Sequence, residues 1–165
     1  MNIDLSDIKI GLFLVLFGLA FGILMGIGFG ANESAFENYI AQGVSAHPEV
    51  HDAKSQGKIW RYAQRAHFHA NGIAAFSIGL LLLVAASNLN RKMKKTSSIL
   101  IGLGSLYPLA WLTMFLLSPS LGREAAHGHI VTELFTFTGV VTLVAGFAIL
   151  SGNLFLGLFS DDTGS

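Results

Sequence analysis

The sequence predicts an all-α integral membrane protein, a bundle of four transmembrane helices, on two observations. Of its 165 residues, 52% are hydrophobic and only 12% are charged, a composition more apolar than that of a soluble domain of this length. The apolar residues also gather into four runs, each close to the ~20 residues that a helix needs to cross a bilayer. Backbone groups in hydrocarbon must be paired within their own segment, so each run is expected to be a helix.

The helices are assigned from the runs and their flanks, within one domain that covers residues 1–165. Their expected limits are about 10–30, 58–87, 97–117 and 126–157. A short amphipathic helix is expected at about 35–42, because Ser34 and Glu37 have the spacing of a capping box and Gly43 follows. The second and fourth runs begin alike, with "AHFH" and "AHGH" sixty residues apart, which suggests two repeated hairpins.

Composition and charge limit the partners and the orientation. The chain has no cysteine, which excludes disulfides and thiolate metal sites. Its ten basic and ten acidic residues balance, which argues against a nucleic-acid partner. Four basic residues cluster without an acid in the second loop: Arg91, Lys92, Lys94 and Lys95. By the positive-inside rule this loop and both termini are expected to be cytoplasmic; the opposite loops are also basic, but acidic residues dilute them.

All six histidines fall on the side of the membrane opposite to the basic loop. They are His47, His51, His67, His69, His127 and His129. The segment "RAHFHANG" places two of them at the start of the second run, among small residues and after Arg61 and Arg65. A histidine there can bind haem iron, small residues leave room for a flat ring, and arginines can pair with propionates. The pattern therefore favours haem b, although these residues could also simply lie at the membrane surface.

Only one histidine of this pair can serve a given ligand, because residues two apart on a helix point about 200° away from each other. His47 and His51 are four residues apart and could share a copper or zinc ion instead. Glu133 follows His129 by four residues, about one turn inside the fourth helix. It could orient that imidazole or exchange protons with a substrate.

The first and third helices are expected to be mainly scaffold. Gly18, Gly22, Gly26 and Gly30 form a stripe of small residues on the first helix, which is typical of close helix packing. Pro108 falls in the middle of the third helix and is expected to kink it beside Tyr107, a phenol within the membrane that needs a partner.

These motifs resemble those of the styrene oxide isomerases, small bacterial four-helix membrane proteins. The resemblance rests on "RAH" at 65–67 and on "LLSPSLG", which holds Ser118 and Pro119, and it covers about a third of the chain. It implies a multi-pass protein of the bacterial inner membrane and a homotrimer with haem b at the subunit interface. It also implies that His67 ligates an iron that acts as a Lewis acid on a small epoxide. Leu112 and Ile73 stand where the family has a tyrosine and an asparagine, so the haem site and the trimer transfer better than the reaction.

Three function classes follow. The first is a haem enzyme of isomerase type, acting on a small apolar substrate, with Asn71, Tyr107 or Glu133 in catalytic roles. The second is a membrane cytochrome for electron transfer or gas sensing, in which His127 or His129 supplies a second iron ligand. The third is a copper- or zinc-binding membrane protein built on the histidine pairs.

Overall fold

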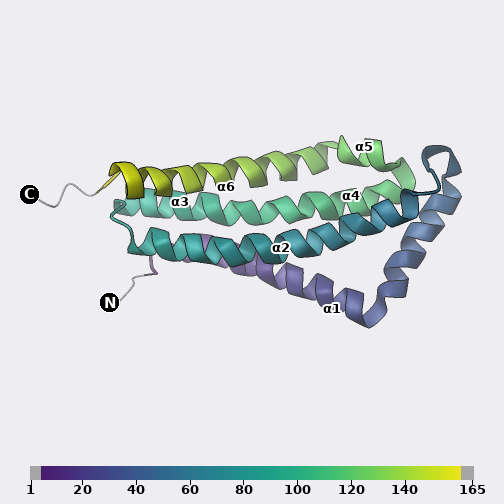
Figure 1. Cartoon of the computed structure of the whole chain (residues 1–165), viewed down its shortest axis with the longest axis horizontal. Helices are drawn as coiled ribbons and strands as arrows, with labels where there is room; N and C mark the ends of the chain where they lie inside the picture. The colour runs from purple at the N-terminus through teal and green to yellow at the C-terminus, as the bar shows by residue number, and fades with distance from the viewer. Residues whose placement is uncertain (1–4, 161–165) are drawn as a thin grey trace, which may run out of the picture.

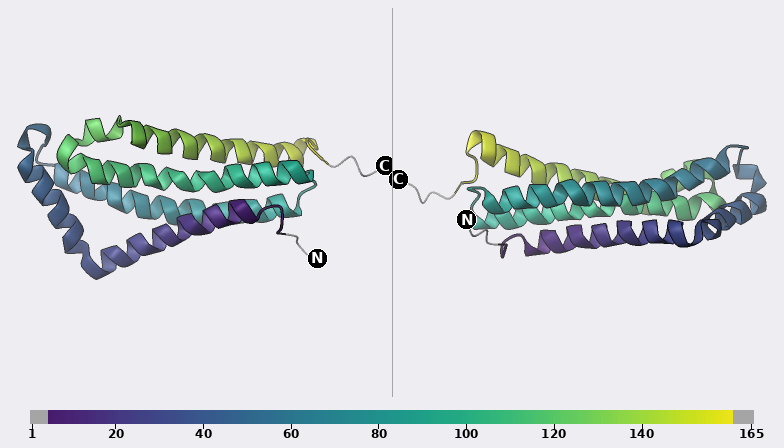
Figure 2. Two further views of the ribbon diagram at one scale, coloured as in Figure 1. Left: turned by 180° about the vertical axis from the view of Figure 1, so that it is seen from behind. Right: turned by 60° about the horizontal axis from the view of Figure 1, so that its bottom comes forward.

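The computed structural model, which describes residues 5–160, is an antiparallel helical bundle (Figures 1 and 2). Its helices are α1 (Lys9–Ala46), α2 (Ser55–Ala86), α3 (Arg91–Leu103), α4 (Tyr107–Leu121), α5 (Arg123–His127) and α6 (Ile130–Leu156), with 3₁₀ turns at Pro48–Val50 and Gly104–Leu106. Within residues 5–160, four segments are long and apolar enough to span a membrane: α1, α2, α3 continued by α4, and α6. The predicted fold class is confirmed, and the chain is a multi-pass membrane protein.

The bundle has two distinct ends. The start of α1, the turn between α2 and α3 and the end of α6 lie together at one end, and the α1–α2 and α4–α6 connections lie at the other (Figure 1). We call the second end the loop end. Large apolar side chains cover the outside of the bundle, including Phe17 on α1 at 64% exposed and Val141 on α6 at 60% exposed. In water such a surface would be costly, whereas in a bilayer it meets lipid.

The first helix is longer than predicted and bends at Asn32 (φ −157°, ψ 61°). The side-chain oxygen of Asn32 accepts the backbone N–H of Ala35 at 3.2 Å. Asn32, rather than Ser34, therefore caps the second half of α1. The short helix expected at 35–42 is that second half, which turns across the loop end and runs to Ala46 (Figure 1). Gly43 does not end it. A Cβ at this position would collide with the Pro119 side chain, so the glycine permits close packing on α4.

The third and fourth predicted helices are both interrupted. Pro108 has no N–H to donate and its ring crowds the preceding turn, and the chain accordingly forms a 3₁₀ turn at Gly104–Leu106 before α4 begins. The helix is thus interrupted just before Pro108, whereas a change in its direction at this point stays a prediction. The helix expected at 126–157 instead starts as α5, breaks at Gly128 and begins again as α6, with His129 as its N-cap.

The glycines of α1 are helix contacts. A Cβ at Gly18 would lie 2.8 Å from the Ser105 side chain, and one at Gly22 would lie 2.7 Å from the Asn71 side chain. A Cβ at Gly26 would lie 2.7 Å from Cε1 of His67. At Gly30, by contrast, no atom lies within 4 Å. The predicted packing role is confirmed for three of the four, and two of these three lie against residues of the histidine segment.

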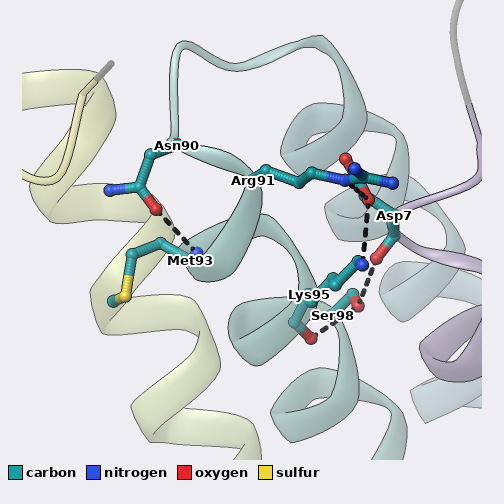
Figure 3. A network of polar contacts seen from close by, with 6 residues as sticks. All are labelled: Asp7, Asn90, Arg91, Met93, Lys95 and Ser98. Carbon is teal, nitrogen blue, oxygen red and sulfur yellow. Dashed lines mark hydrogen bonds and ion pairs between the residues drawn. The ribbon is translucent and has the colours of Figure 1, made fainter. Parts of the chain in front are cut away.

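An ion-pair network fixes the start of α1 to α3 at the end opposite to the loop end (Figure 3). The Asp7 carboxylate accepts the Nε–H of Arg91 at 2.9 Å and lies 3.6 Å from Nζ of Lys95. The Ser98 hydroxyl donates to the Asp7 carbonyl at 3.4 Å. The hydrogen bond from Arg91 and the charges of Arg91 and Lys95 lower the pKa of Asp7 below its ordinary value of 3.8, against a smaller opposing effect of burial.

Replacing Asp7 by asparagine should therefore lower stability at neutral pH and leave it unchanged in acid. A carboxyl whose pKa is lowered by folding stabilises the fold above its unfolded pKa, and this contribution disappears as the pH falls through the folded pKa. The measurement is the difference in thermal midpoint between wild type and Asp7→Asn in detergent, at several pH values from neutral to below 3.8. A difference that does not change over this range would contradict the assignment.

Candidate functional site

His67 lies on the face of α2 that packs against α1. Its Nδ1 is 2.7 Å from the carbonyl oxygen of Gly22. A carbonyl can only accept, so Nδ1 carries the hydrogen and donates it, and in the neutral ring the Nε2 lone pair is then free for a ligand. Phe29 of α1 meets the ring edge-on with centroids 5.7 Å apart. The position of α1 therefore sets both the tautomer and the orientation of His67.

Asn71 lies one turn from His67 on the same helix. Its amide nitrogen donates to the His67 carbonyl at 3.1 Å and lies 3.2 Å from Nδ1 and 3.5 Å from Nε2 of the ring. This places a hydrogen-bond donor beside the imidazole ring, nearer to Nδ1 than to Nε2. His67 and Asn71 are thus the two predicted site residues that the structure brings together on the α1 side of α2.

His69 faces the other way, as its spacing from His67 predicts. Its Nδ1 donates to the Arg65 carbonyl at 2.8 Å, and its ring stacks on Trp111 with centroids 5.4 Å apart. Tyr107 lies edge-on to the same imidazole at 5.3 Å, and the Arg65 guanidinium lies 4.7 Å from the centre of the Trp111 ring, a cation–π contact. Arg65, His69 and Tyr107 therefore form a second cluster with α4, away from His67.

Trp111 belongs to this cluster and was missed by the sequence analysis. It follows Tyr107 by four residues, so the two aromatic rings share one face of α4. The sequence did contain a signal for Trp111: two aromatic residues four apart in the third predicted helix, at about the same depth in the membrane as the histidine pair of the second. Phe29, the ring that meets His67, was also missed, because nothing in the sequence indicates which face of the first helix packs on the second.

The remaining predicted site residues do not join either cluster. His127, Glu133 and Arg61 are exposed, and His129 uses its Nδ1 to accept the backbone N–H of Val131 at 3.3 Å. Within residues 5–160 none of these four side chains has a hydrogen bond or ring contact with His67 or His69. Within the same residues the Glu133 carboxylate makes no hydrogen bond to the His129 imidazole, whose Nδ1 is directed at the start of its own helix; the two residues are joined only by the backbone hydrogen bond from the Glu133 N–H to the His129 carbonyl at 3.0 Å.

His47 and His51 lie in the connection between α1 and α2 and are held separately. His47 is 3.5 Å from the Glu49 carboxylate, whereas Nε2 of His51 donates to the Pro119 carbonyl at 3.0 Å. In the described part of the chain, no group of three or more His, Cys, Asp or Glu side chains is arranged to hold a metal ion.

Comparison with models of known protein families, with curated proteins and with solved structures finds no match to this chain.

Proposed function

We propose that this protein is a haem b protein of the membrane, with His67 as the axial iron ligand, and that it acts as an isomerase on a small apolar, epoxide-like substrate. One observation carries the proposal. Nδ1 of His67 donates to the Gly22 carbonyl at 2.7 Å, an arrangement that leaves Nε2 as a ligand and raises its basicity, as in many histidine metal sites.

The residues around His67 fit a bound haem in further respects. Gly22 and Gly26 let α1 approach the imidazole closely, because a Cβ at Gly26 would lie 2.7 Å from its Cε1. Phe68, the next residue, is 65% exposed, so an apolar surface continues outward from the ligand. Histidine ligation with an apolar surround is the usual environment of haem b.

The chain's own residues would hold the ligand and the substrate. When bound, ferric haem supplies a Lewis acid that polarises the oxygen of an epoxide-like substrate. The Gly22 carbonyl fixes the orientation of the imidazole. The Asn71 amide, 3.5 Å from Nε2, supplies a hydrogen-bond donor next to the imidazole ring. Phe29 and Phe68, with ring centroids 5.7 and 5.2 Å from that of His67, keep water away from it.

Assembly and location form part of the proposal. We assign the chain to a homotrimer in a bacterial inner membrane, with haem at the boundary between subunits, on the resemblance described above. The exposure of Phe68 supports this, because the α1–α2 surface beside His67 can accept a neighbouring subunit. The basic cluster at the start of α3 supports a cytoplasmic position for the termini.

The test is the absorption spectrum of the detergent-purified protein, oxidised and then reduced with dithionite, with metal content measured on the same sample. We expect a Soret band from high-spin iron that binds added ligands. A low-spin spectrum in both oxidation states would indicate a cytochrome with two histidine ligands, and copper or zinc without a Soret band would indicate the metal-binding class. Either result would contradict the proposal.

A further inference from the structure

A groove lies between α2 and α6 on the membrane-facing side of the bundle. It contains an open hollow of about 340 Å³ lined by Phe76 and Leu80 of α2 and by Leu143, Val144 and Phe147 of α6. The segment formed by α3 and α4 packs against both helices. The lining is wholly apolar, so the hollow suits a hydrocarbon chain that enters from the bilayer.

Polar side chains follow on the same two helix faces toward the loop end. His69 precedes Phe76 by seven residues and Leu80 by eleven, so all three share one face of α2. Glu133 precedes Val144 by eleven residues and shares the corresponding face of α6. From His69 to Phe76 the distance along the helix axis is about 10 Å. The groove is therefore apolar in the membrane and polar near its loop end.

Tyr107 of α4 lies where these polar faces meet. A Cβ at Gly139 of α6 would lie 2.6 Å from the Tyr107 backbone nitrogen, and the Tyr107 ring lies 5.3 Å from the His69 ring on the α2 side. Tyr107 thus contacts both walls. Leu143, one turn after Gly139, lines the apolar hollow, so this polar region and the hollow are neighbours along α6.

The polar region has unused hydrogen-bonding groups. The His69 Nδ1–H is donated to the Arg65 carbonyl at 2.8 Å, which leaves Nε2 as an acceptor. Within the described residues the Tyr107 hydroxyl has no hydrogen-bond partner, and the Nε1–H of Trp111 is buried without one. The Arg65 guanidinium lies over the Trp111 ring, 4.7 Å from its centre, and the groups left unused are uncharged. A complementary ligand is therefore a neutral head that accepts and donates hydrogen bonds, attached to an apolar tail.

We propose that this groove binds a membrane-soluble quinone or its quinol, with the ring beside His69 and Tyr107 and the tail in the hollow. A quinone oxygen accepts from the Tyr107 hydroxyl, and a quinol hydroxyl donates to Nε2 of His69. The flat ring suits a position against the His69 and Tyr107 rings, whose centroids lie 5.3 Å apart. The site lies on the opposite side of α2 from His67, so it does not depend on the function proposed above.

The test is photolabelling of the full-length protein in liposomes with an azido-substituted decylbenzoquinone, followed by mass spectrometry of the labelled peptides. We expect label within 69–80 and 133–147, displaced by unlabelled decylubiquinone but not by decanol. Tyr107→Phe removes only a hydroxyl, and His69→Phe keeps a ring on Trp111. In each variant, the concentration of decylubiquinone that displaces half of the label should rise by roughly 2- to 10-fold, which corresponds to the loss of one hydrogen bond.

Two tryptophan substitutions on α6 provide a matched pair. Val144 is 59% exposed and lines the hollow, whereas Val141 is 60% exposed and does not. Val144→Trp should reduce displaceable labelling about fivefold or more by filling the hollow, and Val141→Trp should leave it unchanged. Leu80→Trp fills the hollow from α2 if Val144→Trp does not fold.

Equal effects at Val141 and Val144, or label spread over the lipid-facing surface, would mean that the quinone only partitions into the bilayer. Displacement by decanol would mean a lipid-tail hollow without recognition of the ring, and either result would overturn the proposal.

Discussion

We expect the His67→Ala protein to be purified with at least about tenfold less haem per chain than the wild type, because even partners of metal ligands contribute about 10- to 100-fold in affinity. The substitution removes Nε2, the nitrogen left free by the 2.7 Å hydrogen bond from Nδ1 to Gly22. It also leaves a space beside Gly26, where free imidazole can enter. Haem per chain is measured from the pyridine haemochrome, and imidazole in the buffer should restore part of the Soret band.

His69→Ala is the control for this prediction. His69 has an equally free Nε2, but its ring stacks on Trp111 on the other side of α2, so its loss should leave the haem content unchanged. Recovery with imidazole separates loss of a ligand from general misfolding, which imidazole would not correct. Retention of haem in His67→Ala with loss in His69→Ala would show that His69 is the ligand. Loss in neither variant would exclude both histidines.

The membrane helices could be predicted because hydrophobicity is a property of each segment. The four apolar runs led to the four spans directly, and Pro108 indicated the interruption of the third. The shape of the loop end could not be predicted in the same way. Gly43 has the composition of a helix end, yet it serves contact with Pro119, 76 residues later in the chain. Only the tertiary structure decides between these two uses of a glycine.

The candidate site was predicted in part for a similar reason. The 200° separation of residues two apart on a helix correctly separates His67 from His69. The sequence does not say which helix each one faces, so the predicted set of Asn71, Tyr107 and Glu133 combined residues from different surfaces. Asn71 lies with His67, Tyr107 lies with His69, and Glu133 is exposed on α6.

Replacing Gly11 by alanine should give the largest loss of stability among single-methyl changes in α1. Its Cβ would lie against the backbone carbonyl of Ser98, and a Cβ at Gly102 would lie 2.9 Å from the Gly11 Cα, so the backbones of α1 and α3 are in contact. Backbone atoms cannot move aside as a side chain can, and overpacking of this kind costs about 1–3 kcal/mol. For a chain of this size the thermal midpoint falls by roughly 2–4 °C per kcal/mol.

Gly30→Ala is the matched control on the same helix, since no atom lies within 4 Å of the added methyl group. It should leave the thermal midpoint unchanged or raise it slightly, because alanine favours the helix over glycine by up to about 1 kcal/mol. Both midpoints are followed by circular dichroism in detergent.

The same face of α1 contacts His67 through Gly22 and Gly26. Displacement of α1 in Gly11→Ala should therefore also lengthen the His67–Gly22 hydrogen bond and reduce haem retention. Equal midpoints for the two variants would mean that α1 and α3 can separate without cost, and the position of α1 would then not control the imidazole.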